Sequence, residues 1–248
     1  GHGGEPPFRM MNRWFTRYLF GVENDVEKDP KAWIVREGDD RLEPTSYPDY
    51  PNPEASPVRF FLGPGAPQAG SLLMNKPAKK SYETLVDNFS FSGSTLAKAE
   101  WTDHRLIYLT PPLKEDLHIS GTPSIKIKAS SDKPAVNLSV WLVSLPWTES
   151  RNPRPTDNII TRGWADLRNY RSLTESEPLK AGHFYEMTFE LEPDDQIIPA
   201  GKQIGLMIFS SDREYTLWPD PGTRLTLDLN GTEITLPVVG GIGAVKFE

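Results

Sequence analysis

The chain has 248 residues, and its 27 basic and 34 acidic side chains give a formal net charge of −7. This acidic balance disfavours a broad nucleic-acid surface, which needs clustered Lys and Arg. The absence of cysteine excludes a disulfide scaffold, a zinc finger, an iron–sulfur site and a cysteine nucleophile. No apolar run approaches the ~18 residues of a membrane span. No signal peptide is recognised either, so both a cytoplasmic and a secreted protein stay open.

The first segment predicts a short amphipathic helix. Pro6 and Pro7 suit its first turn, and Gly21 stands where a left-handed C-terminal cap belongs. Apolar side chains recur every three to four residues and make one face of the helix. They are Phe8, Met11, Phe15 and Leu19, widened by Trp14 and Tyr18. Residues 22–30 then predict a solvated loop, and residues 32–35 a short strand.

The next segment is rich in proline. Eight prolines fall between residues 43 and 77, and the whole chain has 24, roughly twice the usual share of 5%. Proline suits turns and strand ends and rarely lies inside helices. We therefore predict an extended connector over residues 39–85, with at most one strand at residues 58–62.

From about residue 86 the apolar pattern changes to a period of two. The alternation recurs at residues 125–127, 136–142, 185–191, 204–208, 225–229 and 234–236. Strands of this kind, separated by Pro, Gly, Asp and Asn, predict a mainly β fold, an antiparallel two-sheet sandwich over residues 86–248. A jelly roll and an immunoglobulin-like sandwich both fit. The Cys…Trp…Cys signature of the latter is absent, and the long connection at residues 146–162 suits a jelly roll.

A search for catalytic motifs is largely negative. No serine has glycine at both −2 and +2, as a nucleophile elbow requires. No phosphate-binding loop, dinucleotide-binding glycine pattern, calcium loop or helical metal-ligand pair occurs. The sequence therefore predicts neither a metal site nor a cofactor.

The four histidines allow different interpretations. His104, beside Asp103, could be a base held by a carboxylate, but a polar residue entering a strand is the favoured interpretation. His118 and His183 are predicted to be surface loop residues. His2 lies in a Gly-His-Gly-Gly turn before the predicted helix, where it could display an imidazole at a loop tip or belong to a tag remnant.

Two further groups of residues have a functional and a structural interpretation. The acidic pair Asp194 and Asp195 could support acid–base chemistry, but the adjacent proline favours a solvated turn. Several tryptophans could form a sugar-binding platform, since indole faces stack on flat apolar surfaces, although core or interdomain packing is favoured. These tryptophans are Trp141, Trp147, Trp164 and Trp218.

Several segments together resemble a known family. Residues 109–143 (LTPPLKEDLHISGTPSIKIKASSDKPAVNLSVWLV) resemble the opening of the C-terminal β-sandwich of Xaa-Pro dipeptidyl-peptidases. The same domain occurs in cocaine-esterase-like (CocE/NonD) and α-amino-acid-ester hydrolases. The resemblance continues in residues 162–173 (RGWADLRNYRSL) and in the strand–turn–strand run LEPDDQIIPAGKQIGLMIFSSD, and it covers about residues 5–241. It implies a jelly-roll-like sandwich preceded by a short helical segment of an α/β-hydrolase domain.

The resemblance also implies a catalytic role for one residue. In this family an α/β-hydrolase domain supplies the nucleophilic Ser, then the Asp, then the His of the triad. His2, followed at once by the predicted helix, aligns with that His, the general base, provided that Gly1–Gly4 is native sequence. The Ser and Asp have no counterpart here, so residues 1–38 resemble the last helix and strand of a truncated α/β-hydrolase domain. The missing N-terminal domain is then the partner of the apolar helix face.

The function implied by the resemblance is release of N-terminal Xaa-Pro dipeptides by acyl transfer, with a peptide or an ester as substrate of the full enzyme. This chain alone is expected to be inactive. Its sandwich is expected to pack on the catalytic domain and to wall the substrate pocket, with residues 146–162 on that side. It could also contribute to a homodimer; no nucleic-acid or membrane partner is expected. A carbohydrate-binding jelly-roll module and a structural-only stabilising domain are the alternatives.

Overall fold

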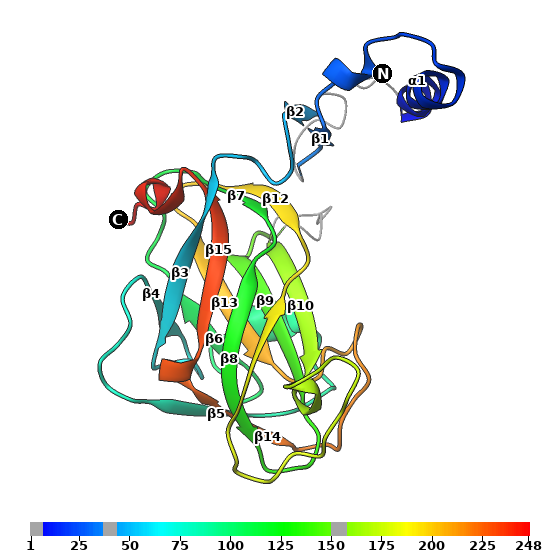
Figure 1. The fold of residues 1–248 in the computed structure, drawn as a ribbon. Helices are drawn as coiled ribbons and strands as arrows, with labels where there is room; N and C mark the ends of the chain where they lie inside the picture. The colour runs from blue at the N-terminus through cyan, green and yellow to red at the C-terminus, as the bar shows by residue number, and fades with distance from the viewer. Residues whose placement is uncertain (1–6, 37–43, 150–157) are drawn as a thin grey trace.

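The computed structural model describes residues 7–36, 44–149 and 158–248, and it has two unequal parts (Figure 1). The smaller part, which we call the arm, comprises the described residues from 7 to 50. It contains α1 (Pro7–Phe20), the 3-10 turn η1 (Val26–Lys28) and an antiparallel pair, β1 (Ala32–Ile34) with β2 (Thr45–Tyr47). In Figure 1 the arm projects from one end of the larger part, and α1 lies farthest from it. The predicted helix at the start of the chain is confirmed.

The larger part is a β-sandwich. Its strands follow one hydrogen-bonded path, β10-β9-β13-β6-β4-β3-β15-β8-β14-β5, with β11 on β8 and β7 joining β12 to β15. All pairs are antiparallel except β4 with β6. The prediction of a mainly β, antiparallel fold is therefore confirmed. The strands are β3 (Ala55–Gly63), β4 (Gly70–Leu73), β5 (Tyr82–Val86), β6 (Leu106–Leu109), β7 (Leu117–Gly121), β8 (Ser124–Ser131), β9 (Asn137–Leu145), β10 (Ile159–Asp166), β11 (Tyr185–Glu190), β12 (Asp194–Ile198), β13 (Gln203–Phe209), β14 (Arg224–Asp228) and β15 (Glu233–Val239). The short helical elements are α2 (Gly93–Lys98), η3 (Leu167–Asn169), η4 (Leu229–Gly231) and η5 (Gly241–Ala244).

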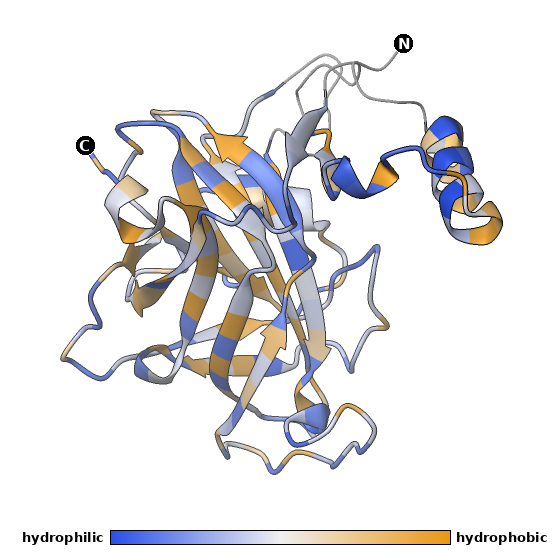
Figure 2. Ribbon diagram, turned by 45° about the horizontal axis from the view of Figure 1, so that its top comes forward, coloured by the Kyte–Doolittle hydropathy of each residue, from blue (hydrophilic) through white to orange (hydrophobic). Residues whose placement is uncertain are grey.

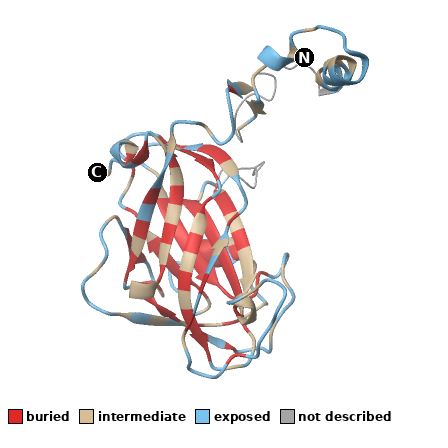
Figure 3. Ribbon diagram, in the orientation of Figure 1, coloured by how far each residue is buried: buried red, intermediate tan, exposed pale blue. Residues whose placement is uncertain are grey.

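The main core fills the space between the two layers, as the buried residues along the strands show (Figure 3). Strand β9 illustrates how the sequence builds it. Leu138, Val140 and Leu142 point into the main core, while Trp141 and Val143 point to the opposite face. That outer face is covered by α2, which forms a second, smaller core with β6, β9 and β13. Strand β9 is consequently buried on both faces.

The proline-rich segment contains more strands than the sequence predicts. The sequence predicts one strand at residues 58–62, whereas the structure has β3, β4 and β5 between residues 55 and 86. Residues 55–61 of β3 pair with β15, and the register places Pro57 opposite Pro237. The two residues that have no backbone N–H to donate are therefore paired with each other in the sheet. The expectation of a single strand is wrong, while the boundaries of the three predicted domains stay a prediction.

A close packing contact fixes α2 on the sheet. An ideal Cβ atom at Gly93 would lie 2.3 Å from two ring carbons of Trp141, whose indole nitrogen donates to Asp212 at 2.9 Å. We expect Gly93→Ala to lower the free energy of unfolding by about 1–3 kcal/mol, because the ring or the helix must move. Urea unfolding measures this. The matched control is Gly243→Ala, whose Cβ would meet nothing within 4 Å; equal shifts for both variants would contradict the expectation.

Candidate functional site

The polar side of α1 is occupied by the chain that follows it. Arg13 donates from Nη1 to Asp29 Oδ2 at 2.8 Å and from Nη2 to the carbonyl of Asn24 at 3.0 Å, and the Asn24 amide donates back to the Arg13 carbonyl at 2.8 Å. Arg17 donates to Glu27. This bond is the largest cause of the lowered pKa of Glu27. The segment 24–29 therefore covers the polar side of the helix.

The helix ends as the sequence predicts. Gly21 has a φ of +70°, a left-handed conformation that favours glycine, and donates from its N–H to the Arg17 carbonyl at 3.1 Å. The next residue, Val22, donates to the Thr16 carbonyl at 3.3 Å. The Gly21 bond, from the residue after the helix to the carbonyl four residues back, is the αL arrangement that ends many helices. It turns the chain back along the polar side of α1.

The apolar face of α1 is left in solvent. Its six side chains are between 44% and 84% exposed, and they are Phe8, Met11, Trp14, Phe15, Tyr18 and Leu19. Trp14 contacts the rings of Phe15 and Tyr18, with centroids 5.6 and 4.7 Å apart, so the patch is continuous. Figure 2 shows the hydrophobic colour along this helix. Since a covered aromatic side chain buries about 150–250 Å², the face amounts to several hundred Å², a size that marks interaction sites.

A buried polar cluster holds the arm to the sandwich, and we call it the anchor network. Arg36 of the arm donates from Nε to Asp195 Oδ1 on β12 at 2.7 Å, and His118 Nε2 on β7 lies 2.9 Å from the same oxygen. Arg36 also donates to Thr45 Oγ1 at 3.0 Å and to the hydroxyl of Tyr47. The side chains of Arg36 and Asp195 are only 11% and 3% exposed. The network thus joins β1 and β2 to β7 and β12.

The electrostatics of Asp195 favour its ionised form. Burial alone would raise the pKa of this carboxyl group. The hydrogen bonds from His118 and Ser120 and the positive charge of Arg36 outweigh burial and lower the pKa. Opposite charge and hydrogen bonding therefore keep a buried carboxylate charged at neutral pH.

The anchor network corrects two predictions. The sequence predicts a solvated turn at Asp194 and Asp195, but both lie in β12 and Asp195 is buried. The sequence predicts a surface loop for His118, which instead lies in β7 with its ring hydrogen-bonded. The pairing of β7 with β12, which the sequence does not reveal, moves both residues from the surface into a strand pair.

The other predicted site residues do not come together into a catalytic site. His104 has a structural role: Nδ1 lies 2.9 Å from the Val86 carbonyl and the ring stacks on Phe91. His183 is an exposed turn residue, as predicted. His2 and residues 150–157 of the 146–162 loop lie outside the described residues. Across the described ranges, no group of acidic or histidine side chains is arranged to hold a metal ion, and no helix is long and apolar enough to cross a membrane.

The predicted tryptophan platform does not form as a single surface. Trp141 and Trp164 both donate to Asp212 Oδ2 at 2.9 Å, and Trp141 is buried under α2. Trp218 stacks instead on Phe89, and Trp147 lies beside α2. The four indoles therefore lie in three separate surroundings, mostly in packing roles.

Comparison with known proteins agrees with the fold. A family model described as the X-Pro dipeptidyl-peptidase C-terminal non-catalytic domain matches residues 24–241. A putative Xaa-Pro dipeptidyl-peptidase of Rhodopirellula baltica is 61% identical over 241 residues, which make up 97% of this chain and 38% of that protein. The chain therefore spans about two fifths of the length of this curated relative.

Two solved structures resemble the chain in fold. An aminopeptidase from the marine sediment archaeon Thaumarchaeota archaeon superposes with a TM-score of 0.69 and 17% identity, over 92% of this chain and 43% of that one. A CocE/NonD family hydrolase from Staphylococcus aureus gives a TM-score of 0.68 and 12% identity, over 94% and 45%. At such identities the likeness shows the fold alone.

Proposed function

Because the chain belongs to the family of X-Pro dipeptidyl-peptidase C-terminal non-catalytic domains, we propose that it is the non-catalytic part of a serine hydrolase that releases N-terminal Xaa-Pro dipeptides by acyl transfer. The printed name of the Rhodopirellula baltica relative supports this activity for the whole protein. The chain itself supplies the β-sandwich and the arm. An α/β-hydrolase domain supplies the catalytic serine and aspartate.

The exposed apolar face of α1 carries the proposal. In an ordinary globular protein an amphipathic helix buries its apolar side and leaves its polar side in water. Here the segment 24–29 covers the polar side, while the apolar side has no cover among the described residues. A catalytic domain that packs on this face would complete the arrangement. The anchor network would then fix that domain relative to the sandwich.

In the assembled enzyme, His2 would act as the general base. It precedes α1 by five residues, so packing of α1 on the catalytic domain would bring the imidazole close to that domain. The His takes the proton of the serine hydroxyl and returns it to the leaving amine, while the Asp fixes the tautomer of the His. The sandwich would wall the substrate pocket, with the 146–162 loop on that side, and thereby exclude long peptides.

Complementation tests this proposal. We expect the purified chain alone to release no chromophore from an Ala-Pro p-nitroanilide. Co-expression with the part of the Rhodopirellula baltica relative that this chain does not match should restore the release, because the serine and aspartate then meet His2. His2→Ala should abolish the restored activity.

Three outcomes would contradict the proposal. Activity of the chain alone that vanishes in His2→Ala would place a full catalytic site within it. A soluble complex without activity would contradict the peptidase assignment. If the complex keeps its activity in His2→Ala, His2 is not the general base, and the chain has only a structural role.

A further inference from the structure

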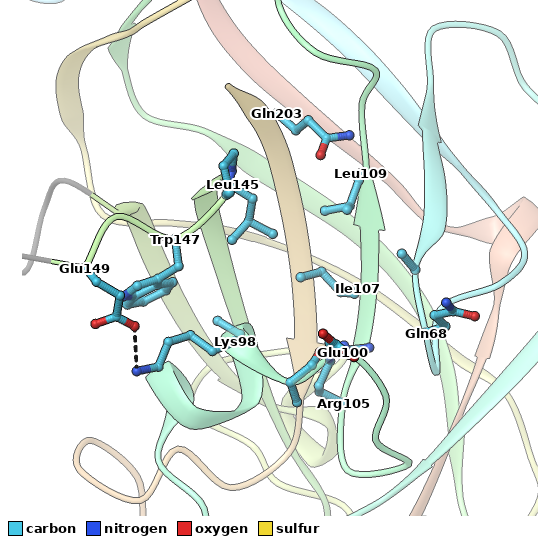
Figure 4. Close-up of a pocket in the computed structure, with 14 residues that line it drawn as sticks. Gln68, Lys98, Glu100, Arg105, Ile107, Leu109, Leu145, Trp147, Glu149 and Gln203 are labelled. Atoms are coloured by element: carbon cyan, nitrogen blue, oxygen red, sulfur yellow. Dashed lines mark hydrogen bonds and ion pairs between the residues drawn. The ribbon is translucent and has the colours of Figure 1, made fainter. Parts of the chain in front are cut away.

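The sandwich has a cavity of about 540 Å³ on the outer face of the sheet, beside α2 (Figure 4). Its apolar floor consists of Ile107 and Leu109 on β6, Leu145 on β9, and Trp147. This volume lies within the usual range of ligand pockets, about 300–1,000 Å³. None of its lining residues belongs to the apolar face of α1 or to the anchor network, but Pro146, Trp147 and Glu149 belong to the 146–162 loop that the proposed function places beside the substrate pocket.

Charged and amide side chains form the rim of this cavity, as Figure 4 shows. Lys98 Nζ lies 3.3 Å from Glu149 Oε1, but the two side chains are 44% and 75% exposed. Such an exposed ion pair is weak, so a ligand carboxylate can replace Glu149 at little cost. The nearby Glu100 carboxylate has no ion-pair partner within the described part of the chain. The rim therefore offers one cation and one unpaired anion.

A buried positive charge lies at the lower edge of the cavity. The guanidinium of Arg105 donates to four backbone carbonyls, at distances of 2.6–3.3 Å, and Arg105 is 1% exposed. These carbonyls accept from four of its five N–H groups, and among the described residues no carboxylate lies within ion-pair distance of it. Burial without a counter-charge lowers the pKa of Arg105 to about 10. This buried positive charge makes the edge of the cavity more favourable for a ligand carboxylate than for a second cation.

We propose that this cavity binds a short zwitterionic peptide with an apolar side chain. The ligand carboxylate pairs with Lys98, the ligand ammonium pairs with Glu100, and the apolar side chain lies on Ile107, Leu109 and Leu145. The identification of the ligand as the Xaa-Pro dipeptide released in the reaction rests on the proposed function. The cavity would then be a product-binding site on the non-catalytic domain.

Calorimetric titration of the full chain tests the proposal with three peptides. Ala-Pro has both charges and an apolar ring, N-acetyl-Ala-Pro amide lacks both charges, and Gly-Gly lacks the apolar side chain. We expect saturable binding of Ala-Pro and binding weaker by at least about tenfold for each of the other two. Lys98→Met and Glu100→Gln should each weaken Ala-Pro binding by a similar factor. Circular dichroism shows whether these variants stay folded.

The matched control is Lys246→Met, since Lys246 forms a similarly exposed ion pair with Glu115 at 2.8 Å away from the cavity. It should bind Ala-Pro like the parent chain. Absence of saturation up to about 10 mM Ala-Pro, or equal binding of the blocked peptide, would overturn the proposal. Equal binding would indicate an apolar docking surface instead. Because titration uses this chain without a catalytic partner, its result is independent of the complementation result.

Discussion

A Phe15→Glu variant of this chain is expected to bind the catalytic half at least about a hundredfold more weakly than the parent chain. Phe15 lies in the centre of the apolar face of α1 and contacts Trp14. Burying a Phe side chain contributes about 1.5–3 kcal/mol. The substitution removes this contribution and places a carboxylate in an apolar interface, where it lacks a partner.

The measurement is co-purification of the chain with the catalytic half, followed by titration of one with the other. Asn12→Glu is the matched control, because Asn12 is an exposed polar residue of the same helix and the substitution adds the same charge. The control should retain most of the affinity. If Phe15→Glu and Asn12→Glu bind equally well, the apolar face of α1 is not the docking surface. In the absence of the catalytic half, the Phe15→Glu variant should also self-associate less than the parent chain.

The features that could be predicted from the sequence are those set by local periodicity. Residues with a spacing of three to four identify α1 and its apolar face, and Gly21 identifies its end. Alternating apolar residues identify strands such as β9 and β13, because each strand has one face in the main core. The pattern alone does not show whether that face is exposed; the absence of its partner is implied by the resemblance, which assigns the face to an N-terminal domain.

The features that could not be predicted depend on pairing between distant segments. Strands β3, β4 and β5 lie among prolines, and only their partners in the sheet make them strands. The anchor network joins Arg36 to Asp195, 159 residues apart. Asp195 lies in the strand–turn–strand run that carries the resemblance, but nothing in that run or around Arg36 links the two residues. A charged pair beside a proline is more often a solvated turn, and here tertiary pairing overrides that local preference.

The cavity beside α2 also depends on pairing between distant segments, so the sequence does not predict it. Its floor comes from β6 and β9, which lie on either side of β13 because β13 pairs with both. The sequence predicts a role in ligand contact for Trp147, as part of a platform with three other tryptophans, and for the 146–162 loop, which contains Pro146 and Glu149. Sequence spacing does not show that Lys98, Glu100 and Trp147 share one hollow.

The anchor network connects the fold to the proposed function. A docking helix can position a catalytic domain only if the helix itself is fixed, and α1 touches mainly the η1 segment of its own arm. The arm meets the sandwich through Arg36 and Tyr47 on one side and Asp195 and His118 on the other. Loss of this contact should therefore affect the attachment of the arm before it affects the sandwich.

Asp195→Asn is expected to destabilise the attachment of the arm by about 3 kcal/mol, at the lower end of the cost of breaking a buried ion pair. The substitution removes the carboxylate that Arg36 and His118 share and leaves the guanidinium charge buried. Asparagine keeps an oxygen that can accept a hydrogen bond, which limits the loss. Hydrogen exchange at the amides of β1 and β2 measures the effect, and urea unfolding reports the stability of the sandwich.

The pH dependence gives this prediction a second readout. Because the folded chain lowers the pKa of Asp195, its contribution is fully present above the pKa of an unfolded Asp, about 3.9. It is lost as the pH falls through the lower folded pKa. The difference between the parent chain and Asp195→Asn should therefore be present at and above about pH 4 and should shrink below it.

Asp49→Asn is the matched control on the same arm. The Lys31–Asp49 pair has a similar distance of 2.8 Å, but its side chains are 71% and 57% exposed. An exposed pair of this kind contributes little to stability, so exchange at β1 and β2 should change little. Equal protection of the arm in Asp195→Asn and Asp49→Asn would show that the anchor network does not hold it. In that case the position of α1 would depend on the catalytic partner, because the contacts of the described residues would not fix it.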